Sequence, residues 1–208
     1  MVGIIGVSSI DSKMIEVIKM SKTFYISDLH FGHKNIIRYD NRPFKSVEEM
    51  DDTLIRNWNN AVSNEDIVYI LGDISWHDED KTYEIFKQLN GRKVLIKGNH
   101  DNIKRGSKLA QCFTSIQDYA ELYLDKKNKV IMSHYPMPFW NGQFRNTVHL
   151  YGHVHNSHQW NICENWIDEL RQLQDIPMRM YNVGCMMEWM GYTPRTIDEI
   201  IEGYNKTK

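Results

Sequence analysis

The sequence has few cysteines, no long apolar stretch and no excess of charge of either sign. The cysteines, Cys112, Cys163 and Cys185, are far apart and odd in number, which argues against a disulfide framework and against a CxxC zinc site. We therefore expect a reducing, cytoplasmic location. No stretch approaches the length of a membrane span, and the opening MVGIIGVSSI lacks the basic start and long apolar core of a signal peptide. We expect no membrane partner.

The charge of the chain is nearly balanced. Its 25 basic and 27 acidic residues give a formal net charge of -2, which weighs against a dedicated nucleic-acid or membrane-surface binder but leaves a nucleotide substrate open. A composition of 41% hydrophobic and 25% charged residues is typical of a globular protein, and a length of 208 residues fits one domain. We expect residues 1–20 to be an N-terminal appendage and residues 21–208 to form a single domain.

Strands and helices alternate in the first half of the chain. Runs rich in β-branched and aromatic residues predict strands at residues 22–27, 66–71, 93–97, 120–124, 129–133 and 148–151. Apolar periodicity and capping residues, such as the pair Ser46 and Glu49, predict helices at residues 46–62, 81–89, 165–173 and from 196 onward. This order predicts an α/β fold whose first half is a βαβαβ unit and whose second half is largely antiparallel sheet.

Potential metal ligands follow directly after five of these strands. In α/β sheets, the loops at the carboxyl ends of strands line the binding crevice, so groups far apart in the chain can meet there. The residues are Asp28 and His30, then Asp73, then Asn99, His100 and Asp101, then His134, and last His153 and His155.

The spacing and chemistry of these residues favour two metal ions. Residues i and i+2 of an extended chain project to one side, which places Asp28 beside His30 and His153 beside His155. Two carboxylates, one carboxamide and four imidazoles are too many for one tetrahedral zinc and suit two ions that share a carboxylate. Oxygen and imidazole donors without thiolate suit Mn, Fe or Zn better than calcium or copper(I).

The succession D-x-H, G-D, G-N-H-D, a lone His and G-H-x-H resembles the calcineurin-like metallophosphoesterase family. The match spans Phe24 to His155, about two thirds of the chain. Each short motif is weak alone, but five in this order at strand ends are a specific signal. The resemblance implies a sandwich of two packed mixed β-sheets flanked by helices, with four layers in the order α-β-β-α.

The resemblance also implies the ligand sets of two divalent ions, with Mn²⁺ expected first and Fe, Zn or Ni as alternatives. The first ion would be held by Asp28, His30, Asp73 and His155. The second would be held by Asp73, Asn99, His134 and His153, so that Asp73 bridges the pair. A hydroxide between the ions would attack phosphorus in line.

Further residues would complete the site by the same resemblance. His100 would stabilise the phosphoryl oxygens or protonate the leaving alkoxide, and Asp101 would orient its ring. His33, Asn35 and Arg38 follow the first motif and could contact substrate, although an ordinary loop or solvated position is at least as consistent with them. Arg42 could likewise contact a phosphate or be a solvated surface residue.

The substrate remains open among several classes. The chain reads GDISWHD and GNHD where protein Ser/Thr phosphatases read GDxxDRG and GNHE, which disfavours that branch. We expect a small phosphoester or nucleotide substrate, hydrolysed as a mono- or diester, and a monomer or homodimer. A nuclease of the same family is possible but not favoured. A catalytically silent interaction scaffold is the other alternative. Residues 156–176 could cap the site or join a dimer interface.

Overall fold

The computed structural model describes residues 21–126, 128–174 and 178–208 and contains two four-stranded sheets. The predicted appendage at residues 1–20 lies outside the described residues. The first sheet consists of β1 (Thr23–Ile26), β2 (Ile67–Ile70), β3 (Arg92–Ile96) and β4 (Phe113–Gln117). The second consists of β5 (Tyr119–Tyr123), β6 (Lys129–Ser133), β7 (Thr147–Tyr151) and β8 (Met180–Asn182).

The first sheet is entirely parallel, and the second is mixed. In the second sheet only β5 and β6 are antiparallel, while β6, β7 and β8 run parallel to one another. The prediction of a largely antiparallel second half was therefore wrong. The reason is that β6 and β7 are joined by the long connection 134–146 and β7 and β8 by a helical crossover, α4 (His158–Gln174), and each of these connections returns the chain in the same direction.

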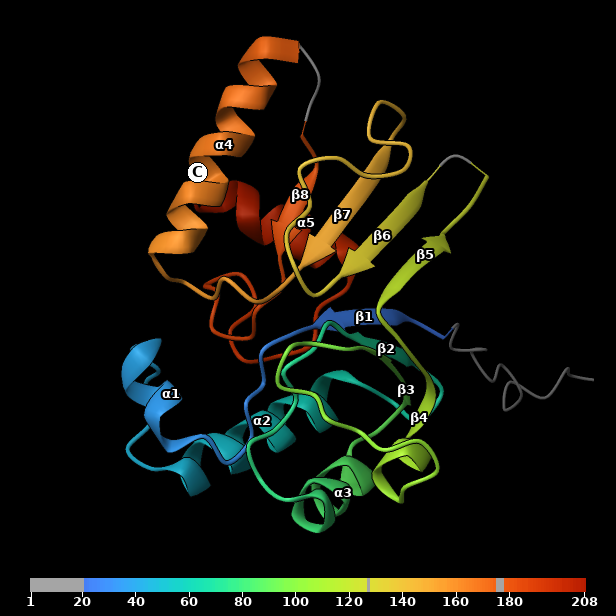
Figure 1. Ribbon diagram of the computed structural model, residues 1–208, viewed down its shortest axis with the longest axis vertical. Coiled ribbons are helices and arrows are strands. Elements are labelled where there is room, and N and C mark those ends of the chain that lie inside the picture. The colour runs from blue at the N-terminus through green and yellow to red at the C-terminus, as the bar shows by residue number, and fades with distance from the viewer. Residues whose placement is uncertain (1–20, 127, 175–177) are drawn as a thin grey trace, which may run out of the picture.

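The helices cover the outer sides of the two sheets (Figure 1). The short α1 (Lys34–Tyr39) follows β1, and α2 (Val47–Ala61) and α3 (Glu79–Gln88) lie on the side of the first sheet away from the second. Helix α4 packs on the second sheet, and α5 (Ile197–Lys206) packs against β8 and β1. The predicted four-layer α/β sandwich is confirmed.

Alternating side chains of the second sheet supply two separate cores. Val130 and Met132 of β6 point into the core between the sheets, whereas Ile131 points into the smaller core beneath α4. Successive side chains of a strand point to opposite faces of the sheet, so a strand that is covered on both faces contributes to two cores. Cys163 and Ile167 of α4 contribute to the smaller core, so α4 closes the outside of the second sheet.

Helix caps explain where the main helices begin. The Thr196 side chain accepts a bond from the Glu199 amide, and the Glu199 carboxylate accepts one from the Thr196 amide, which is a complete capping box for α5. At α2 the predicted box is only half formed. Ser46 Oγ accepts from the Glu49 amide at 3.2 Å, but the Glu49 carboxylate accepts from the amide of Lys45 instead.

The two sheets are joined where the site forms. The Ser27 amide, just past β1, donates to the carbonyl of Val183, just past β8, at 2.8 Å. The His153 amide, past β7, donates to the Asp28 carboxylate, past β1, at 3.1 Å. The carboxyl ends of strands from both sheets therefore meet at one place. Among helices of the described residues, none combines the length and apolar character needed to cross a membrane.

Acid should destabilise the fold through His149 on β7. This side chain is fully buried, and burial lowers its pKa from 6.5 to about 4. In the unfolded chain the ring binds a proton below pH 6.5, whereas the folded protein does not until about pH 4, so the free energy of unfolding falls as pH falls through that window. At pH 5 we expect a loss of about 2 kcal/mol from this group.

The measurement is urea unfolding of the metal-free protein at pH 7 and pH 5, for the wild type and His149→Gln. The glutamine variant should lose less stability between the two pH values. An equal loss in both proteins would contradict the assignment.

Candidate metal centre

Most of the predicted ligands adopt a strained backbone conformation. Among the described residues, seven non-glycine residues have positive φ, and five of these are predicted ligands. Such values, here between 48° and 69°, are costly for residues with a Cβ and persist where the surroundings enforce them, often at functional sites. The five are Asp28, His30, Asp73, His153 and His155.

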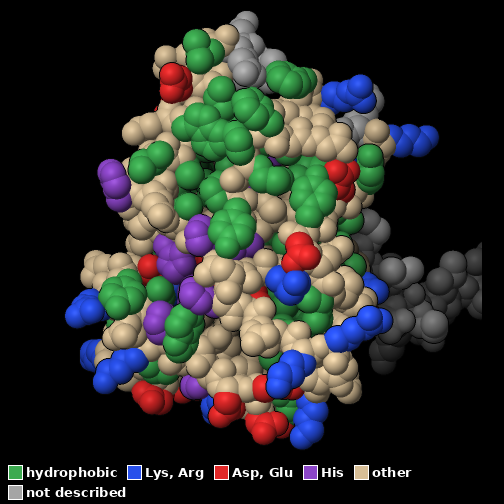
Figure 2. Space-filling model, viewed as in Figure 1, with side chains coloured by type: hydrophobic (Ala, Val, Ile, Leu, Met, Phe, Trp, Pro, Cys, Tyr) green, Lys and Arg blue, Asp and Glu red, His purple; other side chains and the backbone are tan. Residues whose placement is uncertain are grey.

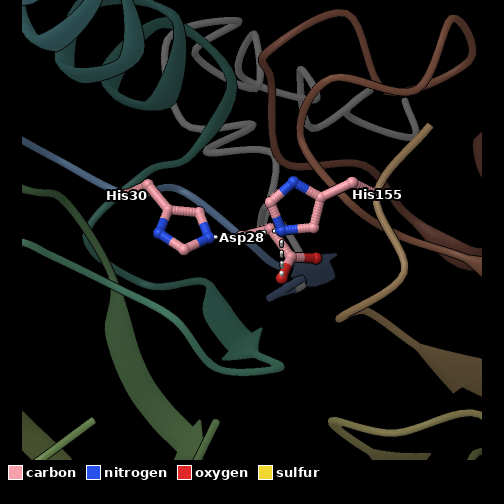
Figure 3. A group of neighbouring side chains, drawn as sticks. All are labelled: Asp28, His30 and His155. Atoms are coloured by element: carbon pink, nitrogen blue, oxygen red, sulfur yellow. Dashed lines mark hydrogen bonds and ion pairs between the residues drawn. The ribbon is translucent and has the colours of Figure 1, made fainter. Parts of the chain in front are cut away.

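The first group of ligand atoms comes from the loops after β1 and β7 (Figure 3). The rings of His30 and His155 point toward one another, with their Nε2 atoms 3.3 Å apart. His155 Nε2 also lies 3.5 Å from Asp28 Oδ1. Ligand atoms of Asp28, His30 and His155 all fall within 4.8 Å of one another, which is the spacing of groups that can share one ion.

The second group comes from the loops after β2, β3, β6 and β7. Asn99 Oδ1 lies 3.1 Å from His134 Nε2 and 3.0 Å from His153 Nδ1. His134 Nε2 lies 3.6 Å from Asp73 Oδ2. The structure therefore brings together the four residues that the resemblance implied for the second ion.

Asp73 lies between the two groups. Its Oδ2 is 3.6 Å from the Nε2 atoms of both His30 and His134, one from each set. Burial raises the pKa of Asp73 despite the opposing effect of His134, and the charge of Asp28 raises it further. Asp28 also falls in a second close group with Asp73 and His134. Two nearby buried carboxylates are costly unless cations lie beside them.

Hydrogen bonds on the outer side fix which ring nitrogens face inward. His134 Nδ1 lies 2.7 Å from the carbonyl of Leu71, which can only accept, so Nδ1 carries the proton and Nε2 presents a lone pair. His155 Nδ1 donates in the same way to Asp40 Oδ1 at 2.7 Å. Burial, followed by the charge of His155, lowers the pKa of His30, which keeps that ring neutral. Two ring nitrogens thus present lone pairs toward the centre, beside the carboxylates of Asp28 and Asp73, and this set of residues fits two divalent cations.

Two glycines let the loops approach closely enough to form the centre. A Cβ at Gly98 would collide with the Asp73 carboxylate. A Cβ at Gly72, whose φ is +90°, would lie 2.5 Å from His134 Nδ1. The G-D and G-N-H-D motifs therefore need glycine because the loops after β2 and β3 are in contact.

Asp40 and Arg42 form a buried pair behind the centre, where the sequence offered Arg42 as a phosphate contact or a solvated residue and did not single out Asp40. Arg42 donates to Asp40 at 2.9 Å and to the carbonyls of Asp28 and Leu29 at 2.9 and 3.0 Å. Burial would raise the pKa of Asp40, but its bond with His155 and the charge of Arg42 lower it overall. Arg42 therefore supports the loop after β1, and its buried position does not suit it to contact a phosphate.

His100 lies at the edge of the centre and Asp101 behind it. His100 Nε2 is 4.0 Å from Asp73 Oδ2, and its side chain is partly exposed. The Asp101 carboxylate accepts from the amides of Gly98, Asp73 and Ile74 at 2.8 to 2.9 Å. In the described chain no hydrogen bond joins Asp101 to the His100 ring, so the implied ring-orienting role has no support. Asp101 instead ties together the loops after β2 and β3.

The three residues suggested for substrate contact separate into two kinds. His33 is half-buried and stacks on Trp76 beside His30. Asn35 and Arg38 are exposed on α1, and Arg38 lines a surface cavity of about 610 Å³ with Lys34 and other residues. Only His33 therefore lies against the predicted ligands.

The fold and site place this protein in a known family. The calcineurin-like phosphoesterase superfamily domain matches residues 22–197, and the chain belongs to that family. Its members generally bind divalent metal ions, and the two Asp/His groups are candidate sites for them. Membership indicates a hydrolase of phosphoesters.

Two of the similar proteins match most of the chain, and a third matches a shorter part. The uncharacterized protein MJ1445 of Methanocaldococcus jannaschii is 35% identical over 91% of this chain and 94% of its own length. The Gene 66 protein of Mycobacterium phage L5 is 42% identical over 39% of this chain and 41% of its own length. The crystal structure of a protein of unknown function, AQ665 of Aquifex aeolicus, superimposes with a TM-score of 0.65 at 28% identity, over 88% of this chain and 99% of that one.

The bond from His155 to Asp40 should strengthen metal binding. In Asp40→Asn the acceptor loses its charge, so His155 becomes a weaker ligand, and we expect Mn²⁺ affinity to fall about 10- to 100-fold. Chelator-competition titration measures this affinity. Asp168→Asn, which removes a carboxylate from an exposed ion pair on α4, is the control and should bind Mn²⁺ as the wild type does. Unchanged affinity in Asp40→Asn would show that the bond does not tune the ligand.

Proposed function

We propose that the protein is a phosphoesterase that uses two divalent metal ions to hydrolyse a phosphate mono- or diester of a small molecule or nucleotide. The observation that supports this most is the convergence of seven side chains from five loops on one partly buried centre, with Asp73 between the two groups. The seven are Asp28, His30, Asp73, Asn99, His134, His153 and His155. Mn²⁺ is the proposed ion, and Fe, Zn or Ni would suit the same donors.

The two ions, when bound, would stabilise charge on the phosphoryl oxygens and lower the pKa of water enough to provide a nucleophile at neutral pH. The protein's own residues prepare this chemistry. His134 and His155 keep their protons on Nδ1, which leaves Nε2 free toward the centre. Asp101 fixes the loops after β2 and β3 relative to each other by accepting hydrogen bonds from both.

His100 is the proposed proton donor to the leaving oxygen. Its partly exposed ring lies beside Asp73 but outside the two close ligand groups, so the ring can face the substrate without being a metal ligand. Its backbone amide donates to Asp73 Oδ1 at 3.0 Å, which fixes the position of the residue against the centre. A ring in that place can reach an oxygen that departs from phosphorus.

The test is hydrolysis of p-nitrophenyl phosphate and bis(p-nitrophenyl) phosphate by purified protein supplied with two equivalents of Mn²⁺. We expect activity that EDTA removes and added Mn²⁺ restores. Activity that survives complete metal removal would contradict the proposal. Parallel assays on cyclic nucleotides, nucleoside monophosphates and single-stranded DNA would separate a small-molecule enzyme from a nuclease.

The complete ligand set weighs against a catalytically silent scaffold, because a scaffold has no need for seven converging donors. A stable protein that binds no metal and hydrolyses no phosphoester would favour the scaffold.

The three cysteines are free thiols, which supports the proposed reducing, cytoplasmic location.

A further inference from the structure

An exposed tryptophan lies beside the candidate metal centre. Trp76, in the loop after β2, is 48% exposed, and its ring centroid is 4.5 Å from that of His100 and 6.0 Å from that of His30. Figure 2 shows histidine side chains gathered on one face of the molecule, with hydrophobic side chains among them. A single exposed aromatic ring is common on protein surfaces, so what sets Trp76 apart is that its open surface borders the rings of His100 and His30.

The indole is held in one orientation. The His33 ring lies nearly parallel to it, with centroids 4.2 Å apart and an interplanar angle of 13°. The Trp76 amide donates to the carbonyl of Phe31 at 2.7 Å, and Ser75 Oγ donates to the same carbonyl at 3.3 Å. The loop that carries Trp76 is therefore bound to the loop after β1 by hydrogen bonds and ring stacking.

The next residue fastens the other side of this loop. His77 bonds to Asp51 of α2 at 2.8 Å, and its ring packs against Gly32 so closely that a Cβ there would lie 2.6 Å away. Both neighbours of Trp76 in the chain are thus tied to fixed parts of the fold. A ring that is already positioned loses little conformational entropy when it binds a partner.

We infer that Trp76 is a specificity residue that stacks on an aromatic ring, such as a nucleobase or an aryl group, in the substrate's leaving group. This rests on the proposed function, in which His100 protonates the leaving oxygen. The organic group bonded to that oxygen must then lie next to His100, and the Trp76 ring is 4.5 Å from the His100 ring. Indole faces bind planar rings of many kinds by stacking.

Among the described residues, Tyr135 is a second half-exposed aromatic ring in contact with predicted ligands, and it borders the other ligand group. It is 49% exposed, and its ring is 4.5 Å from His153 and 5.1 Å from His134. These residues belong to the second ligand group, whereas His100 contacts Trp76. The leaving group therefore lies toward Trp76.

The test compares binding of phenylphosphonate and methylphosphonate, which carry the same anionic group and differ in the ring. Calorimetry on Mn²⁺-loaded wild type should give about 10-fold tighter binding of phenylphosphonate. Trp76→Ala should bring the ratio close to one, and Trp76→Phe should keep part of it. Tyr123→Ala removes a ring that is 68% exposed on β5 and should keep the full ratio.

The outcomes distinguish this inference from the proposed function. Equal affinity of the wild type for both phosphonates, or a preference that persists in Trp76→Ala, would overturn the role of Trp76 while leaving hydrolysis intact. An equal loss for both ligands in Trp76→Ala would mean that Trp76 only positions His100, and would also overturn it. A wild type that hydrolyses no phosphoester would overturn the proposed function itself. If Trp76→Ala does not fold, the ratio of the two phosphonate affinities in the wild type and in Trp76→Phe still tests the role of Trp76.

Discussion

Replacement of Asp73 by asparagine is expected to reduce Mn²⁺-dependent phosphoester hydrolysis by more than about 1,000-fold. The substitution preserves the shape of the side chain but removes the one carboxylate that lies 3.6 Å from ligand nitrogens of both groups. Without this charge the two ions lose their shared ligand. The measurement is kcat/KM with p-nitrophenyl phosphate, together with the number of Mn²⁺ ions retained per chain after gel filtration.

The same variant should become more stable when no metal is present. Burial, and repulsion from Asp28, raise the pKa of Asp73, which means that its ionised form is disfavoured in the folded protein above the unfolded pKa. A neutral asparagine removes that penalty, so the free energy of unfolding of the metal-free protein at pH 7 should rise. Asp52→Asn, an exposed substitution on α2, should change neither activity nor stability. Full activity in Asp73→Asn would contradict the bridging role.

Replacement of His100 by glutamine should slow turnover by roughly 100- to 10,000-fold while both metal ions stay bound. The ring lies beside the centre but outside the two close groups of ligand atoms, so its loss removes a proton donor and not a ligand. The loss should be greater for an alkyl phosphate than for p-nitrophenyl phosphate, because p-nitrophenolate can depart without a proton. The measurement is kcat on both substrates beside a metal analysis of each protein.

His158→Gln, an exposed histidine at the start of α4, is the matched control and should keep wild-type turnover. A His100 variant that loses metal would place this residue among the ligands. An equal loss of kcat on p-nitrophenyl phosphate and on the alkyl phosphate would show that His100 stabilises charge rather than donating a proton.

The side chains that converge on the candidate centre could be predicted from the sequence because each one lies within a few residues of a strand. A strand end is a local feature, and the glycine before Asp73, Asn99 and His153 marks a sharp turn at each place. The G-D and G-N-H-D loops then had to converge because β1, β2 and β3 are parallel neighbours whose carboxyl ends share one edge.

The residues around the ligands could not be found in this way. Asp40 and Arg42 lie in an ordinary polar turn, and only tertiary packing buries them against His155 and the loop after β1. Trp76 is a tryptophan in a loop, and nothing local distinguishes an exposed indole from a core one. Its position beside His100 depends on contacts with Phe31 and His33, which the sequence does not reveal.

The missed elements are short or lack a clear pattern. Strand β8 has three residues, and β4 (FTSIQ) is largely polar, so neither carries enough periodicity to predict a strand. Helix α1 has only six residues. Strand direction in the second sheet depends on the crossover through α4, which is a property of the whole fold. Cys163, Ile167 and Leu170 of α4 pack on the outer face of that sheet, so the apolar side of this helix faces the sheet.

Anomalous diffraction from crystals of the Mn²⁺-loaded protein tests directly whether two ions share Asp73. We expect two manganese peaks about 3.5 to 4 Å apart, with Asp73 between them and one peak near each group of histidines. A single peak, or manganese bound away from Asp73, would contradict this expectation.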